Sequence, residues 1–309
     1  MIERVISFFE NKRKIIFYST LILCTIFAFL LFNLKISDGG DDSDYIFGAW
    51  QFLKGISFPT WHGSFYQIIL SAFLWIFGLK IIILKLLSLV LIVFHLFWLN
   101  KTFQNKIPAY ILLLSLIFLA INANILVYAS LTYSEALYFA LQIICIYYSF
   151  QIIEKLQQNI PVIKFWKDWL ILGFFMFLLT NTRNIGISMV LAIVIYLIIY
   201  RKWLALIFSL VPYVVYQVLF IIYKNSYWKF SKVGFEDQFG VMFLIDPYNP
   251  SYGNESLKGF ILRFFENANQ YISGHLFSFV GINIEQNTIL SIIITISFIL
   301  LHLYYRHLQ

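Results

Sequence analysis

Four aspartates lie within seven positions near the start of the chain, directly after its first long apolar stretch. They are Asp38, Asp41, Asp42 and Asp44. Crowded carboxylates can accept a proton from a hydroxyl group or hold a divalent cation such as Mg²⁺ or Mn²⁺. We expect such a role for Asp41 and Asp42, which would also be the ligands of any metal. The alternative, which fits Asp38 better, is that the aspartates only solvate a loop and cap a helix.

A further carboxylate, Glu135, follows Tyr133 and Ser134 next to a long apolar stretch. A charged side chain in lipid is costly, so such residues usually face a cavity or the interior of a helix bundle and mark function. The alternative is a carboxylate that stabilises the positive end of a helix dipole. The sequence leaves both interpretations open.

Three basic side chains are candidates for binding an anion. Arg183 lies in a short turn between two apolar stretches, where a phosphate, an aspartate or lipid headgroups would hold it. Lys85 lies within an apolar run, from which it would reach either headgroups or a lipid-linked phosphate. His62, beside Trp61, is a candidate ligand or proton carrier.

The elements that position these groups are predicted to be helices in a lipid bilayer. Of the 309 residues, 61% are hydrophobic and only 12% are charged, whereas soluble domains carry about 25% charged residues. A bilayer core needs about 20 apolar residues per helix, and apolar stretches occur near 15–34, 64–99, 108–122, 125–153, 168–180, 184–200, 203–223 and 287–305. The net charge of +7 does not indicate nucleic-acid binding, because Lys and Arg occur in short clusters between these stretches.

The distribution of basic residues predicts the topology. In 64–78, Ser64, Gln67 and Ser71 share one face and apolar residues the other, which is typical of an amphipathic interfacial helix. If 64–78 does not cross, the later Lys and Arg clusters all fall in the cytoplasm. We therefore predict a single all-α membrane domain, 1–309, with about eight crossings of the cell (inner) membrane and both termini in the cytoplasm. The segments 35–79 and 224–286 would lie outside, the first with a second juxtamembrane helix at about 44–54.

The order of these motifs resembles the GT-C superfamily of membrane glycosyltransferases over about residues 15–200. Asp41 to Tyr45, followed by Ala49 and Gly55, is similar to the family's acidic pair with Tyr, Ala and Gly at fixed spacing. Phe77-Gly78 before Lys85-Leu86, Ser134-Glu135, and Thr182-Arg183 resemble later motifs. The chain departs from the pattern in having Asp42 where Glu is usual, Lys85 where Arg is commoner, and Trp61 to Phe65 in place of a Lys-Pro-Pro-Leu type sequence.

The resemblance implies an inverting transfer of a sugar from a polyprenyl-phosphate donor to an acceptor glycan, lipid or protein on the extracytoplasmic face. Asp41 would be the general base, and Asp42 or Glu135 would orient the acceptor or help to hold a cation. Arg183 and Lys85 would stabilise the departing phosphate. We expect the remaining contacts to the substrate from Asp44, Tyr45, His62 and Tyr133.

Other functions are compatible with the same composition. A transporter or flippase for a lipid-linked glycan would distribute polar residues through the bilayer depth, whereas here they gather at one face. A polysaccharide polymerase or ligase of another membrane fold would depend on outer arginines and histidine rather than an acidic pair. A non-catalytic subunit of a glycan-assembly complex is the third alternative.

Overall fold

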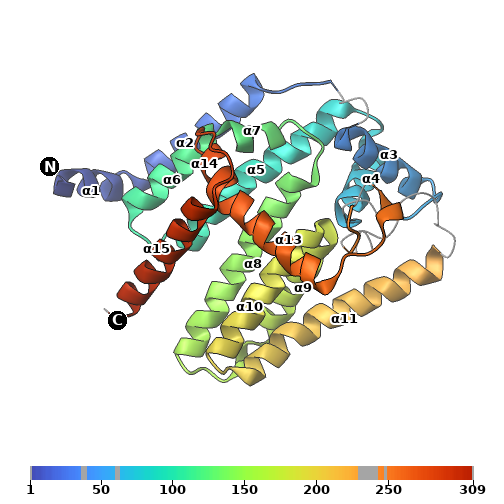
Figure 1. Ribbon diagram of the computed structural model, residues 1–309. Coiled ribbons are helices and arrows are strands. Elements are labelled where there is room, and N and C mark those ends of the chain that lie inside the picture. The colour runs from blue at the N-terminus through green and yellow to red at the C-terminus, as the bar shows by residue number, and fades with distance from the viewer. Residues whose placement is uncertain (1, 36–39, 60–62, 229–242, 247–248, 308–309) are drawn as a thin grey trace. The chain divides into compact units, whose positions relative to one another are not determined.

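The computed structural model describes residues 2–35, 40–59, 63–228, 243–246 and 249–307 (Figure 1). It is 80% helical, and the described residues contain an isolated bridge between Leu244 and Asn254 but no strand. The prediction of an all-α chain is therefore confirmed. Internal contacts divide the chain into two units, 1–238 and 239–309.

The first unit contains helices of very different lengths. They are α1 (Ile2–Asn11), α2 (Arg13–Leu30), α3 (Asp41–Leu53), α4 (Phe65–Phe77), α5 (Ile81–Phe103), α6 (Ala109–Ile121), α7 (Ala123–Tyr128), α8 (Ser134–Gln157), α9 (Trp166–Thr182), α10 (Ile187–Ile199) and α11 (Trp203–Tyr227). By length and composition, α2, α5, α8 and α11 can each cross a membrane, and α4, α6 and α10 are shorter apolar helices. Large apolar side chains on the outside of α10 and α11 are half-exposed, as lipid-facing residues are.

Helices α2 and α5 run antiparallel. Arg13, at the start of α2, donates a hydrogen bond to the carbonyl of Gln104, just after α5. At the other end, Lys85 in the first turns of α5 donates to the carbonyl of Asn33, just after α2. The end of α2 and the start of α5 therefore lie together.

Helices α5 and α8 run parallel, because His95 contacts Phe139 while Phe103, further along α5, contacts Phe150. Two parallel neighbours need a return segment between them, and α6 and α7 supply it. Asn122 separates these two helices, and its side chain accepts a hydrogen bond from the backbone of Asn124 as an N-cap. The apolar stretch predicted at 125–153 is thus two helices, and α8 begins only at Ser134 after an irregular segment, 129–133.

Helix α9 returns antiparallel to α8, since Lys155 near the end of α8 pairs with Asp168 at the start of α9. It runs parallel to α11. A side chain at Gly173 would meet Pro212, and Asn181, two turns later, hydrogen-bonds Gln217 on the later part of α11. Figure 1 shows α8 to α11 as neighbouring helices.

These directions place one set of helix termini together, which we call the site end: the end of α2, the starts of α5 and α8, and the ends of α9 and α11. The opposite helix termini carry more basic residues than the site end. They have Lys12, Arg13, Lys14, Lys101, Lys106, Lys155, Lys164, Lys167, Arg201 and Lys202, whereas the described residues of the site end include Lys35, Lys54, Lys80, Lys85, Arg183 and Lys224. Charge is therefore distributed unequally between the two ends of the first unit.

The two short helices α3 and α4 pack against each other at the site end. Helix α3 begins at Asp41, three residues before the predicted start, with Gly40 as its N-cap. In α4 the polar stripe of Ser64, Gln67 and Ser71 is buried, whereas Ile76 is 61% exposed. The buried face is mixed, because Tyr66, Leu70 and Leu74 are buried beside this stripe, while the exposed apolar face suits a membrane interface.

The second unit contains α13 (Leu257–Gln270), a π-helical turn at Tyr271–His275, α14 (Leu276–Ser278) and α15 (Thr288–His307). Within it, Arg263 donates a hydrogen bond to the carbonyl of Leu244. The last apolar stretch predicted from the sequence corresponds to α15, whose residues 288–301 form a short apolar helix.

Candidate functional site

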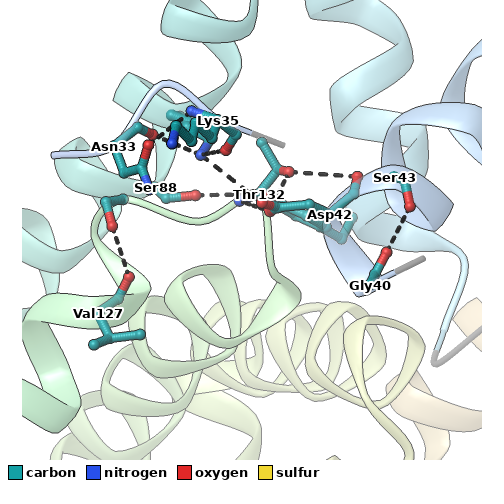
Figure 2. Close-up of polar contacts among 11 residues, drawn as sticks. Asn33, Lys35, Gly40, Asp42, Ser43, Ser88, Val127 and Thr132 are labelled. Carbon is teal, nitrogen blue, oxygen red and sulfur yellow. Dashed lines mark hydrogen bonds and ion pairs between the residues drawn. The ribbon is translucent and has the colours of Figure 1, made fainter. Parts of the chain in front are cut away.

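Asp42 lies fully buried in the first turn of α3 and holds the segment before α8. Its Oδ1 accepts hydrogen bonds from both the backbone N–H and the hydroxyl of Thr132, each at 2.6 Å. Figure 2 shows Asp42 and Thr132 facing each other, with Gly40 and Ser43 on the other side of the turn. A buried carboxylate accepting two short hydrogen bonds is held in a single orientation.

Lys85 is the counterion of Asp42. Its Nζ lies 3.8 Å from Asp42 Oδ2, and both side chains are only 1% exposed. The same ammonium donates hydrogen bonds at 2.6 Å to the carbonyls of Asn33 and Lys35. Two donors of the ammonium are thus taken up by carbonyls of this chain, and the phosphate or headgroup contact of Lys85 stays a prediction.

Asp41, the first residue of α3, differs from its neighbour. It is half-buried, and its carboxylate makes no hydrogen bond or ion pair with any described residue. Asp44, also in the first turn, is exposed. Asp41 is therefore the carboxylate of this turn that is both sheltered and available to accept a proton.

Glu135 and Arg183 form an ion pair between the start of α8 and the end of α9, with 2.5 Å between Glu135 Oε1 and Arg183 Nη1. Arg183 Nη1 also donates to Ser134 Oγ at 3.3 Å. The side chains of Arg183 and Glu135 are 27% and 17% exposed. A negative group was expected beside Arg183 in the form of a phosphate, an aspartate or lipid headgroups, and the partner found is Glu135. The Nε and Nη2 donors of Arg183 have no partner among the described residues.

Tyr45 connects the acidic turn of α3 to this ion pair. Its buried hydroxyl lies 2.7 Å from Ser134 Oγ, and its ring packs against Tyr66 and Tyr133 at centroid distances of 5.2 and 6.5 Å. Burial raises the pKa of Tyr45. The hydrogen bond with Ser134 and the charge of Arg183 oppose this rise, while the charges of Glu135 and Asp41 add to it. The phenol therefore stays neutral and acts as a hydrogen-bonding group rather than as a base.

Most of the residues selected from the sequence converge at the site end. The structure brings together Asp41, Asp42, Tyr45, Lys85, Tyr133, Glu135 and Arg183 through two ion pairs and the contacts of Tyr45. Asp44 is exposed on α3 and makes no side-chain contact with them in the described part of the chain. His62 lies outside the described residues.

A divalent cation at Asp41 and Asp42 can be tested against these contacts. Asp42 is already neutralised by the Lys85 ammonium, and its Oδ1 is taken up by Thr132. Across the ranges that the structure describes, no three His, Cys, Asp or Glu side chains are grouped as ligands. Asp42 Oδ2 is buried and makes no hydrogen bond with a described residue, so this oxygen and Asp41 would hold a cation. The mechanism proposed below has no step that passes through a metal.

The sequence did not single out the hydroxyl groups that organise the site. Thr132 and Ser134 are completely buried, and Ser88 contacts the hydroxyl of Tyr66 at 3.3 Å. A signal was present, since Thr132 and Ser134 flank Tyr133 directly before Glu135. Buried hydroxyl groups beside a carboxylate usually serve as its hydrogen-bond partners or those of its neighbours.

Comparison with known proteins identifies no relative of this chain. No family model matches the chain, and no curated protein or solved structure matches it either.

Proposed function

We propose that this protein is a membrane glycosyltransferase of the GT-C type, which transfers a sugar from a polyprenyl-phosphate donor to an acceptor hydroxyl on the extracytoplasmic face. The observation that carries the proposal is that Asp41, a half-buried carboxylate without a partner among the described residues, and the half-buried Arg183, which pairs with Glu135, both lie close enough to Tyr45 for their charges to act on it. A base for the acceptor and a cation for the departing phosphate are the two groups that this reaction needs from the protein.

The helix directions of the first unit support seven crossings with the N-terminus in the cytoplasm, and an eighth crossing by α15 would place the C-terminus there as well. In this topology α2, α5, the return through α6 and α7, α8, α9, α10, α11 and α15 each cross once. Helices α3 and α4 then lie on the outer surface. The basic ends of the helices face the cytoplasm, as the positive-inside rule requires, and the site end faces outward.

In the proposed mechanism, the Asp41 carboxylate accepts the proton of the acceptor hydroxyl while the oxygen attacks the anomeric carbon of the donor. The bond from that carbon to the phosphate oxygen breaks, and polyprenyl phosphate leaves with the bonding electrons. A single displacement of this kind inverts the anomeric configuration. The base accounts for roughly 10²–10⁴-fold of the rate.

Arg183 is positioned to stabilise the negative charge that develops on the departing phosphate. Glu135 and Ser134 hold the guanidinium of Arg183 through Nη1, so that the other N–H donors of Arg183 are fixed in position. Preorganised donors of this kind require no rearrangement as the charge appears. Asp42 and Lys85 do not contact the substrate in this mechanism. They support Asp41 by holding α3, α5 and residues 33–35 together.

The proposal is tested with purified protein in liposomes that contain a polyprenyl-phosphate sugar with a radiolabelled sugar. We expect the label to move to an added acceptor and the new linkage to have the opposite anomeric configuration. Product analysis by NMR gives the configuration, and a membrane-impermeant hydrolase reports the leaflet of the donor. Movement of intact donor between leaflets without transfer would identify a transporter. A protein that gives neither transfer nor movement would be a non-catalytic subunit.

Replacing Arg183 with alanine is expected to lower kcat/KM for the lipid-linked donor by about 10-fold or more, because the departing phosphate loses a hydrogen bond to a charged group, which is worth about 1.5–3 kcal/mol. The control is Arg201→Ala, which removes an exposed arginine from the opposite end of the helices. Steady-state kinetics against donor concentration measure the effect. An unchanged KM and kcat in Arg183→Ala would contradict the phosphate role.

A further inference from the structure

A polar cleft of about 160 Å³ lies at the site end between α9, α11 and the segment that leads into α4. Its walls include Phe58, Ser64, Asn181, Gln217, Phe220 and Lys224. Gly63, at φ +114°, allows this segment to approach α9 closely, because a Cβ there would lie 2.5 Å from the carbonyl oxygen of Asn181. The cleft is thus formed by tight packing of three elements.

The base of the cleft is a fixed network of neutral polar groups. Gln217 Nε2 donates to Thr180 Oγ1 at 2.8 Å, and Asn181 Nδ2 donates to Gln217 Oε1 at 3.1 Å. Asn181 uses its Nδ2 in these bonds, and its Oδ1 has no partner among the described residues. The hydroxyl of Ser64, outside this network, has none either. Both groups line the cleft and are available to a ligand.

Lys224 supplies the charge of the cleft. It lies in the last turn of α11, half-buried, with its Nζ 5.4 Å from the centre of the Phe58 ring. Within the described parts of the chain, no carboxylate lies within ion-pair distance of it. Lys85 and Arg183 differ in this respect, since each has a carboxylate partner.

The cleft also has an apolar side. Phe220 packs edge-on against Phe58 and against Phe177 of α9, and Ile221, which lines the cleft, is 52% exposed. Exposed apolar residues on a helix that is long and apolar enough to cross a membrane face lipid. A ligand in this cleft can therefore keep a hydrocarbon chain in the bilayer while its polar group reaches Lys224.

We propose that this cleft binds the phosphate ester of a lipid, with Lys224 as the cation and with Ser64 and Asn181 as contacts for neighbouring hydroxyl groups. A lysine ammonium binds phosphate as a point charge, and the low dielectric constant of the interface strengthens the attraction. Two lipids carry this chemistry: the polyprenyl-phosphate carrier and a phospholipid of the bilayer. The assignment to the carrier rests on the proposed function, whereas phosphate binding at Lys224 does not.

The test measures binding without transfer. Wild-type protein and the variants Lys224→Gln, Lys224→Arg and Lys54→Gln are purified in neutral detergent, and the ³¹P NMR signal of a short-chain polyprenyl phosphate is titrated, then that of a short-chain phosphatidylglycerol. Lys54 is an exposed lysine at the end of α3 and serves as the matched control. Size-exclusion profiles confirm that the variants are folded.

We expect Lys224→Gln to weaken binding of polyprenyl phosphate by about 10-fold or more, and Lys224→Arg and Lys54→Gln to retain it. A loss confined to polyprenyl phosphate supports a carrier site, and an equal loss for phosphatidylglycerol supports a headgroup site. Equal affinity of wild type and Lys224→Gln for both lipids would overturn the inference. Because no transfer is measured, a wild type that binds but does not transfer contradicts only the proposed function.

Discussion

Replacing Asp41 with asparagine is expected to lower the rate of sugar transfer by roughly 10²–10⁴-fold, the usual contribution of a general base. Asparagine has nearly the same shape but cannot accept the proton of the acceptor hydroxyl. The Asp41 carboxylate makes no hydrogen bond or ion pair with described residues, so the change removes no native contact of this side chain. The protein should therefore remain inserted, folded and able to bind the donor, and kcat should fall with little change in the KM for the donor.

Two variants separate a base from a general effect of charge. Asp168→Asn removes a partly exposed carboxylate at the opposite end of the helices, where its pair with Lys155 contributes little, and it should leave transfer unchanged. Asp41→Glu keeps a base but moves it by one methylene, so it should retain more activity than Asp41→Asn. Full activity of Asp41→Asn in the liposome assay would remove Asp41 from the mechanism.

The sequence predicted the local elements around the site well because their signals are local. The polar stripe of Ser64, Gln67 and Ser71 has helical spacing, and the structure buries this stripe on α4. The acidic turn was expected to precede a helix, and α3 begins within it at Asp41. The start of α8 was misplaced because residues 125–133 are as apolar as a membrane-spanning helix. In the structure the helix ends at Tyr128, and α8 begins only at Ser134.

The partners of the charged groups could not be predicted, because they come from remote parts of the chain. Asp42 and Thr132 are 90 residues apart, and Lys85 reaches a carbonyl 52 residues before it. A lysine in an apolar run has the same sequence pattern whether it meets a lipid phosphate or a buried carboxylate. Only the packing of α2, α3 and α5 decides that Lys85 meets Asp42.

Lys224 was missed for a related reason. Gln217 and Lys224 are seven residues apart, which places them two turns apart on one face of α11, and this spacing was a usable signal. A cation at the end of an apolar helix is commonly assigned to the membrane interface. The cleft becomes visible only when α9 and the segment before α4 are placed against that face.

Removing the charge of Asp42 is expected to destabilise the protein by about 3–5 kcal/mol, because breaking a buried ion pair leaves the other charge uncompensated. The suitable variant is Asp42→Asn, which keeps Oδ1 as the acceptor for Thr132 and so isolates the effect on Lys85. Thermal unfolding in detergent, followed by intrinsic tryptophan fluorescence, measures the change. Asp44→Asn, at an exposed position in the same turn, should shift stability by less than about 0.5 kcal/mol.

The double variant Asp42→Asn with Lys85→Met decides what the pair does. Methionine removes the buried charge and keeps an unbranched side chain, while the carbonyls of Asn33 and Lys35 belong to exposed residues that can bind water. Most of the lost stability should therefore return. If the stable double variant also transfers sugar, the pair only positions α3 beneath Asp41. If it is stable but inactive, the charge of Asp42 or of Lys85 takes part in the chemistry. A failure to regain stability would show that the buried pair is not what holds these elements together.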